Sequence, residues 1–141
     1  GAYEKAAGRG LHLGAHMILG LPGESKEEML QHAIELSKLP IQTLKLHHLQ
    51  IIKNTQMAKQ LDETPEMFDL FQPDDYVDFV TEFIALLRPD IVLERFIAEA
   101  PPGLLVAPQW NGLKNFEMVS KIDKALVAQD TWQGKAYSIP V

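Results

Sequence analysis

Hydrophobic residues along this chain alternate between extended and helical patterns. An almost unbroken apolar run over Leu11 to Leu19 predicts a buried strand, and a second strand is predicted over Thr43 to Ile52. Ile91 to Ala98 reads as a third strand, and Leu104 to Ala107 as a short extended segment. Because helical patterns separate the strands, the sequence predicts an α/β fold with right-handed crossovers and a parallel sheet.

The helical patterns begin and end with recognisable signals. Lys26 to Lys38 has apolar residues at helical spacing, and it follows Ser25, which can act as its N-cap. Glu28 stands three residues after Ser25, so the pair forms the sequence of a capping box. Further helices are predicted over 73–87, with a buried apolar stripe from Tyr76 to Leu87, and over 115–129. Thr55 is interpreted as the N-cap of a helical turn.

Composition and charge limit the classes of function. With 141 residues and 46% hydrophobic content, the chain fits a single domain over residues 1–141. The net charge of −6, with Lys and Arg scattered, argues against a nucleic-acid surface or an anionic membrane surface. No stretch approaches the roughly 20 apolar residues that span a bilayer, so no membrane partner is expected.

The segment from His16 to Glu24, HMILGLPGE, combines a buried strand, a glycine-proline turn and a capped helix. In α/β proteins, ligands bind at the carboxyl ends of strands, and a helix N-terminus favours negative charge there. Glycine lets the backbone approach a bound molecule closely. By itself the junction suits an ordinary strand-to-helix turn equally well.

This segment is followed one βα unit later by LKLHHLQIIKNT, over 44–55, and the two together resemble the second half of a radical S-adenosylmethionine (radical SAM) enzyme. The resemblance continues through QPDDYV, RPDIVLER and APQW, so it covers most of the chain. The similar group is the uncharacterised Fe–S oxidoreductases, related to Elp3-like and oxygen-independent coproporphyrinogen III oxidase proteins. The resemblance implies a partial (β/α) TIM-like barrel, with its last βα units in 1–90 and a C-terminal extension in 91–141.

The chain departs from this family because it contains no cysteine. Radical SAM enzymes hold a [4Fe–4S] cluster with three closely spaced cysteines, because thiolates are the ligands that such clusters require. The resemblance therefore implies a cluster bound by an upstream part of a longer protein. We expect this chain to be a C-terminal fragment that is inactive alone, and an oxygen-sensitive cluster implies the cytoplasm.

The resemblance also implies the reaction of the parent protein. A reduced cluster would cleave S-adenosylmethionine to a 5′-deoxyadenosyl radical, which abstracts hydrogen from an unknown substrate. The alternative is a non-catalytic α/β module that binds a nucleotide or a partner protein. A third reading is a tRNA-modifying enzyme of the Elp3-like kind, which would need a basic surface that this acidic chain does not supply.

Five residues are candidates for binding S-adenosylmethionine. Ile18 falls on the strand position that contacts adenine in the resembling enzymes, and Gly20 opens the turn beside it. His16 takes a position that is Asp in the coproporphyrinogen oxidase relatives, so a plain strand histidine is an equal alternative. His47 and Gln50 stand where the relatives shape the adenine pocket.

Alternation along the second strand places Lys45, His47 and Leu49 on one face and Leu46, His48 and Gln50 on the other. Adjacent histidines on a strand cannot bind one ion together, so no metal site is predicted from this chain.

Charged residues at the end of the third apolar strand require a partner or a function. In the resembling group an Arg recurs ahead of the Ala-Pro-x-Trp segment. Arg95, Trp110 and Lys114 are therefore the candidates for the substrate side of the pocket, whereas no catalytic residue is assigned. A structural ion pair between Glu94 and a Lys or Arg is the competing interpretation.

A partial barrel leaves one edge of its sheet without a neighbouring strand. Exposed edges offer unpaired backbone groups to other chains. We expect either a homodimer through this edge or coverage of the edge by the tail, residues 132–141.

Overall fold

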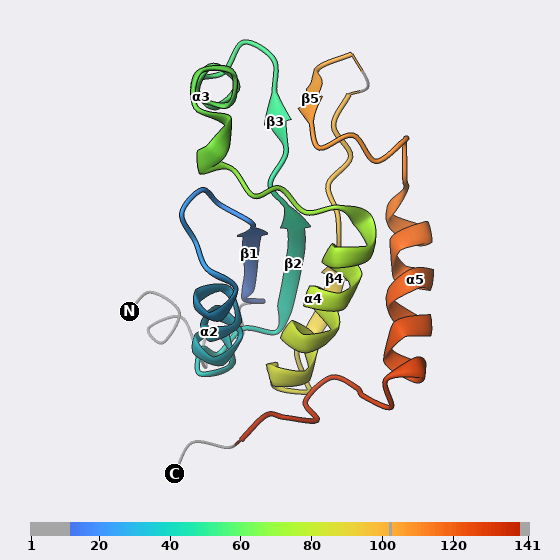
Figure 1. The fold of residues 1–141 in the computed structure, drawn as a ribbon. Coiled ribbons are helices and arrows are strands. Elements are labelled where there is room, and N and C mark those ends of the chain that lie inside the picture. The colour runs from blue at the N-terminus through green and yellow to red at the C-terminus, as the bar shows by residue number, and fades with distance from the viewer. Residues whose placement is uncertain (1–11, 102, 139–141) are drawn as a thin grey trace.

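The structure is a computed structural model that describes residues 12–101 and 103–138. Its main sheet has the strand order β1-β2-β4, all parallel: β1 (Gly14–Leu19), β2 (Thr43–His48) and β4 (Val92–Arg95). A second sheet pairs β3 (Ile51–Ile52) with β5 (Leu105–Ala107) in antiparallel fashion, beyond the carboxyl ends of β1 and β2 (Figure 1). The predicted α/β class with a parallel sheet is confirmed, and Leu11 lies outside the described residues.

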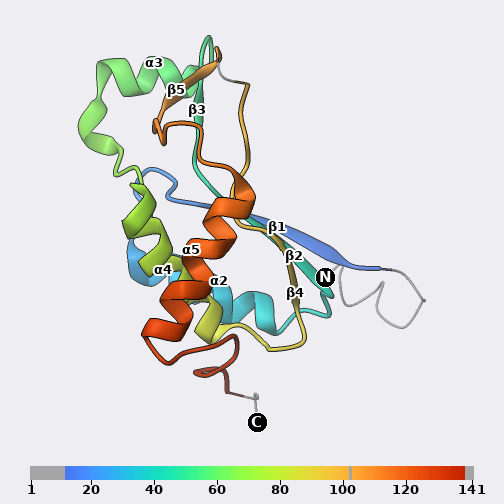
Figure 2. The same ribbon diagram turned by 90° about the vertical axis from the view of Figure 1, so that its right-hand side faces the viewer.

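Three long helices cover one face of the main sheet. They are α2 (Lys26–Ser37), α4 (Pro73–Leu86) and α5 (Asn115–Ala128), and each ends one residue before its predicted end. Figure 2 shows all three on the same side of the sheet, with no described helix on the other side. The shorter α3 (Gln56–Glu63) leads into a 3-10 turn, η1 (Pro65–Met67). Within 12–101 and 103–138, no helix combines the length and apolar character needed to cross a bilayer.

The core lies between the main sheet and α4. The predicted apolar stripe of this helix is confirmed, because all of its members are buried: Tyr76, Val77, Phe79, Val80, Phe83, Ile84 and Leu87. They pack with Leu19 of β1 and with Leu44 and Leu46 of β2, which are fully buried. Removing these side chains from water is the main stabilising contribution to the fold. This packing determines which face of the main sheet the helices cover.

The helix caps follow from local sequence. Ser25 Oγ accepts a hydrogen bond from the backbone N–H of Glu28 at 3.1 Å, and the Glu28 carboxylate accepts one from the N–H of Ser25 at 3.3 Å. The predicted capping box is therefore present. Thr55 caps α3, because its Oγ1 accepts from the backbone N–H of Ala58 at 3.1 Å.

The predicted strand over Thr43 to Ile52 is wrong as a single element. The N–H of Leu49 still donates to the carbonyl of Leu19 in β1 at 2.8 Å. Beyond this hydrogen bond the chain leaves the main sheet. Ile51 and Ile52 then pair with β5. The break arises from a partner distant in sequence, which apolar periodicity does not reveal.

The third strand is also shorter than the predicted Ile91 to Ala98. The backbone N–H groups of Phe96 and Ile97 donate to Asn115 Oδ1, at 3.0 and 3.3 Å, instead of to a neighbouring strand. A side chain at the start of α5 therefore replaces the strand ladder after Arg95.

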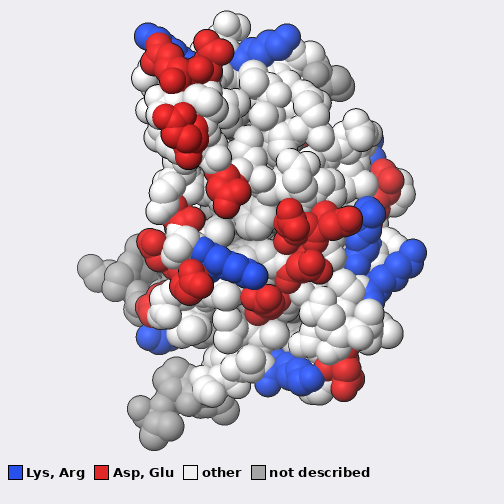
Figure 3. Space-filling model, in the orientation of Figure 1, with Lys and Arg blue, Asp and Glu red and all other residues white. Residues whose placement is uncertain are grey.

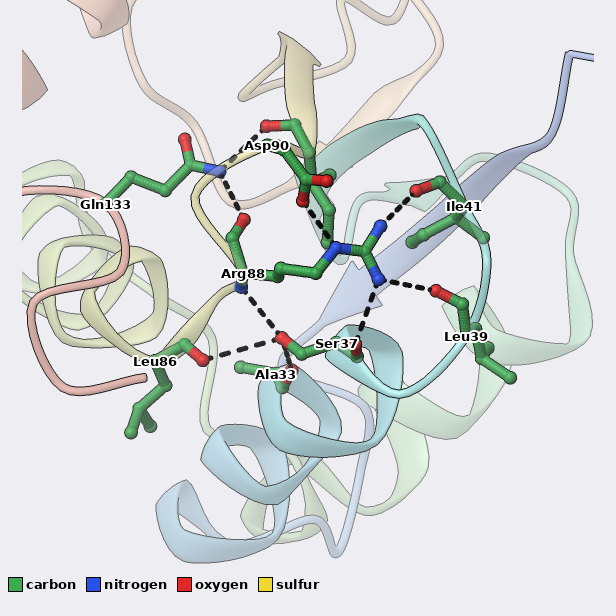
Figure 4. A network of polar contacts seen from close by, with 9 residues as sticks. Ala33, Ser37, Leu39, Ile41, Leu86, Arg88, Asp90 and Gln133 are labelled. Carbon is green, nitrogen blue, oxygen red and sulfur yellow. Dashed lines mark hydrogen bonds and ion pairs between the residues drawn. The ribbon is translucent and has the colours of Figure 1, made fainter. Parts of the chain in front are cut away.

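At the amino-terminal end of the sheet, Arg88 ties three segments together (Figure 4). Its guanidinium donates to the carbonyls of Ser37 at 3.0 Å, Leu39 at 2.8 Å and Ile41 at 2.6 Å. Its backbone N–H donates to Ser37 Oγ at 2.9 Å. One side chain thus satisfies the carbonyls that link α2 to β2.

The described part of the tail, residues 132–138, packs back on the domain. Gln133 Nε2 donates to the carbonyls of Arg88 at 3.0 Å and Ile91 at 2.7 Å, and Figure 4 shows this contact beside Arg88. The N–H of Gly134 donates to the carbonyl of Ile84 at 3.2 Å. This part of the tail therefore covers the end of α4, whereas we expected from the sequence either coverage of the sheet edge by the tail or a homodimer through that edge.

Candidate functional site

The face of the main sheet opposite the helices carries most of the predicted cofactor residues. Cα pairing places Ile18 beside His47 and His16 beside Lys45 on neighbouring strands. Ile18, the residue before the last of β1, remains 38% exposed although it is apolar. We call this surface the open sheet face; its residues are His16, Ile18, Lys45, His47, Val92, Glu94 and Arg95.

Alternation along β2 explains which side chains reach the open sheet face. Lys45 is exposed and His47 is half-buried, whereas Leu46 and His48 are buried toward the helices. The predicted alternation is confirmed from Lys45 to His48, whereas Leu49, which was expected on the face of His47, is buried. His47 and His48 accordingly contact different groups: the ring of His47 meets that of His16, and the ring of His48 meets that of Trp110.

The two imidazoles on the open sheet face touch edge to face. The ring centroids of His16 and His47 are 4.7 Å apart, with 69° between the ring planes. His47 Nδ1 donates to the carbonyl of His48 at 3.1 Å, because a carbonyl can only accept. In neutral His47 the lone pair therefore resides on Nε2. This nitrogen is an acceptor for an amino group.

Several effects act on the pKa of His47. Burial lowers it, the hydrogen bond to the His48 carbonyl opposes this effect, and the positive charges of His16 and Arg95 lower it further. The net direction is below the ordinary value for histidine. The neutral acceptor form is favoured at neutral pH.

The predicted structural ion pair of Glu94 is present. Lys45 Nζ lies 3.8 Å from Glu94 Oε2, and both side chains are partly exposed. Such a pair contributes little to stability because water screens it. It nevertheless neutralises one of the two strong cations on the open sheet face.

Three other candidate residues meet in a separate cavity of about 160 Å³ near the ends of β2 and β4. Gln50, Trp110 and Lys114 line it together with His48. Gln50 Nε2 donates to the carbonyl of Ala98 at 2.9 Å. Gln50 was predicted to act with His47 on the cofactor, but the structure places it with the substrate candidates Trp110 and Lys114.

Trp110 forms the wall of this cavity and is itself 8% exposed. Its ring stacks on that of His48, and its Nε1–H donates to the carbonyl of Phe71 at 3.0 Å. Lys114 stands at the surface, where its Nζ lies 3.6 Å from Glu99 Oε1. Trp110 is thus held by the core, whereas Lys114 is accessible.

His48 is a cavity residue that sequence reasoning did not select. Burial lowers its pKa to about 4, with a smaller contribution from His47. The signal was its place on the apolar side of β2, since a histidine there must be buried.

Gly20 borders a different, larger cavity of about 580 Å³ between the first turns of α2 and α4. Its φ of 91° is a backbone conformation that favours glycine, and a Cβ there would lie 3.2 Å from the Phe71 ring. Carboxylates of Glu24, Glu66, Asp69, Asp75 and Asp78 surround this cavity. Figure 3 shows acidic side chains gathered over this side of the molecule.

The residues present do not fit an iron–sulfur cluster, because the chain has no cysteine. In the described ranges, no three His, Cys, Asp or Glu residues gather in a way that could hold a metal ion. The open sheet face carries groups of the kind that an adenine ring contacts. It offers an exposed apolar side chain at Ile18 and an amino-group acceptor at His47 Nε2.

Comparison with known proteins gives consistent results. The Radical_SAM C-terminal domain matches residues 41–128. YtqA of Bacillus subtilis is 29% identical over 91% of this chain and 39% of its own length, and YhcC of Escherichia coli K12 is 33% identical over 72% and 32%. The chain thus spans about two-fifths or less of these relatives.

The fold is also found among solved structures. The archaeal Elp3 of Methanocaldococcus infernus, with an N-terminal deletion, superposes with a TM-score of 0.74 and 13% identity, covering 89% of this chain and 29% of Elp3. The family match covers more than half of the chain, and the fold agrees with it. The predicted family is confirmed: this chain belongs to the radical SAM proteins, as a member of their C-terminal domain family.

Proposed function

We propose that this chain forms part of the barrel wall of a radical SAM oxidoreductase, in which the open sheet face borders S-adenosylmethionine and an unknown substrate. The observation that carries the proposal is the polar character of this uncovered face. His16, Lys45 and His47 stand on consecutive strands with no described helix over them. In α/β barrels, such residues line the interior, and ligands bind at the carboxyl ends of the strands.

Three residues of the chain would receive the adenine. Ile18 supplies apolar contact, His47 accepts a hydrogen bond at Nε2, and His16 holds the His47 ring by its edge. An imidazole can also flank the face of a base. The hydrogen bond from His47 Nδ1 to His48 orients the ring before any ligand arrives.

The cluster would be bound by cysteines outside this chain. When bound to such a cluster, S-adenosylmethionine supplies a 5′-deoxyadenosyl radical for hydrogen abstraction. The oxygen sensitivity of that cluster favours a cytoplasmic protein. We expect the chain alone to be inactive and to bind S-adenosylmethionine only weakly, since the group that chelates the methionine moiety lies elsewhere.

The proposal is tested on the longer reading frame that contains the Gly1 codon. The frame is read for a tight cysteine triplet, and the protein is expressed, reconstituted anaerobically and assayed for release of 5′-deoxyadenosine. His47→Ala should reduce the release strongly, whereas Lys124→Ala, on the exposed side of α5, should leave it unchanged. A frame without such cysteines contradicts the enzyme and favours the non-catalytic binding module. Full release by His47→Ala contradicts the role of the open sheet face.

A further inference from the structure

Charge is distributed unevenly between the two sides of this acidic molecule. The net charge is −6, and α4 presents Asp75, Asp78 and Glu82 to solvent on the helix side, where Figure 3 shows acidic side chains gathered. On the open sheet face the balance is reversed. Lys45 and Arg95 stand there against one carboxylate, that of Glu94.

A register shift produces this arrangement. Leu44 pairs with Leu93, but the next residue of β2, Lys45, pairs with Arg95. Glu94 is therefore the extra residue of an irregularity in the ladder. Two consecutive charged residues of β4 lie opposite one residue of β2, and both are exposed.

The ion pair uses only one of the two cations. Lys45 Nζ lies 3.8 Å from Glu94 Oε2, so the charge of Lys45 is balanced. The guanidinium of Arg95 forms no ion pair or side-chain hydrogen bond with any residue in 12–101 and 103–138. Arg95 is thus an unbalanced cation on the open sheet face.

The position of Arg95 relates this cation to the proposed adenine residues. Arg95 is the last residue of β4, which is the strand next to β2. Its positive charge contributes to lowering the pKa of His47. A guanidinium offers parallel N–H donors that match the two oxygens of a carboxylate or phosphate. The excess of positive charge on this face also attracts anionic ligands.

We propose that Arg95 forms an anion subsite at the carboxyl end of β4, which binds a carboxylate or phosphate group of the substrate. This inference rests on the proposed function, because only there does the open sheet face border a substrate. It narrows the substrate to an anionic molecule. Arg95 then acts as a substrate-positioning residue and takes no part in proton transfer.

The test is an NMR titration of the chain with inorganic phosphate and, separately, with acetate, at constant ionic strength maintained with chloride. The Nε–Hε resonance of Arg95 reports binding, and Arg95→Gln is compared with Lys124→Gln, which removes one positive charge from α5. The subsite predicts saturable shifts at Arg95 and His47 with at least one anion. It also predicts binding that is roughly tenfold weaker in Arg95→Gln and unchanged in Lys124→Gln.

The two anions distinguish a phosphoryl substrate from a carboxylate substrate. Absence of a shift at Arg95 with both anions overturns the subsite. Anion binding that is weakened equally in Arg95→Gln and Lys124→Gln also overturns it, because it indicates nonspecific electrostatic attraction. Displacement of the anion by S-adenosylmethionine assigns Arg95 to the cofactor and overturns the substrate role. The proposed function is tested separately by titrating Arg95→Gln with S-adenosylmethionine. If the resonance of Ile18 still shifts in this variant, the proposed function stands even when the anion subsite fails.

Discussion

The imidazole of His48 stacks on the indole of Trp110, with 3.7 Å between the ring centroids and 14° between the ring planes. This contact joins the end of β2 to the segment between β5 and α5, which are distant in sequence. His48 is 2% exposed, and its Nδ1 has no hydrogen-bond partner among the described residues. A neutral ring is therefore required at this position, because an unpaired buried charge is costly.

The His48 contact predicts a pH dependence of stability. Burial lowers the pKa of His48 from 6.5 to about 4 in the folded chain, so between these values the unfolded chain binds more protons. The free energy of unfolding should then fall by up to about 3 kcal/mol as the pH drops through this window. Urea denaturation between pH 4 and 7 measures it.

His48→Phe provides the comparison, since it keeps an aromatic ring beside Trp110 without a titrating group. Its stability should fall less steeply with acid than that of the original chain. Parallel curves for the two proteins would show that His48 does not carry the effect.

Trp110→Phe tests whether the indole is held by the core. The substitution keeps a ring beside His48 but removes the donor that reaches the Phe71 carbonyl at 3.0 Å. We expect a loss of about 1–2 kcal/mol in the free energy of unfolding, because the carbonyl is left without this partner. Unchanged stability in urea denaturation would mean that this hydrogen bond contributes nothing.

Arg88→Lys should destabilise the chain by about 2–4 kcal/mol. A lysine cannot donate simultaneously to the carbonyls of Ser37, Leu39 and Ile41, as the guanidinium does. Asp90→Asn is the matched control, because the Asp90 side chain also pairs with Arg88 but is 74% exposed. Its cost should stay below about 1 kcal/mol. Thermal unfolding by circular dichroism measures both, and equal losses would refute the role of the carbonyl contacts.

Gly20→Ala should cost about 1–3 kcal/mol, because φ at this residue is 91°. The added Cβ would also lie 3.2 Å from the Phe71 ring. Gly103→Ala is the control, since a Cβ there meets nothing within 4 Å and should change stability by about 0.5 kcal/mol or less. If both variants unfold at the same urea concentration, Gly20 is not required by the turn.

Features set by neighbouring residues could be predicted from the sequence. The capping box at Ser25 and Glu28 and the buried stripe of α4 depend on short spacings, which are visible in one segment. The alternation of His47 and His48 follows from the two-residue period of a strand. Of the candidate site, such short-range patterns predict that His47 lies on one face of the sheet and His48 on the other.

Features set by distant partners could not be predicted. The strand ends at His48 because its neighbour β1 ends at Leu19 and Ile51 and Ile52 pair with β5 instead. β4 ends because Asn115 accepts from Phe96 and Ile97. Only the fold brings Gln50, Trp110 and Lys114 to one cavity.

The most direct test of the account is to map S-adenosylmethionine on this chain by chemical-shift perturbation. The account predicts weak binding, with the shifts centred on His16, Ile18 and His47 of the open sheet face. Shifts centred on the cavity beside Gly20 and Asp75, or on the cavity between Gln50 and Trp110, would contradict it.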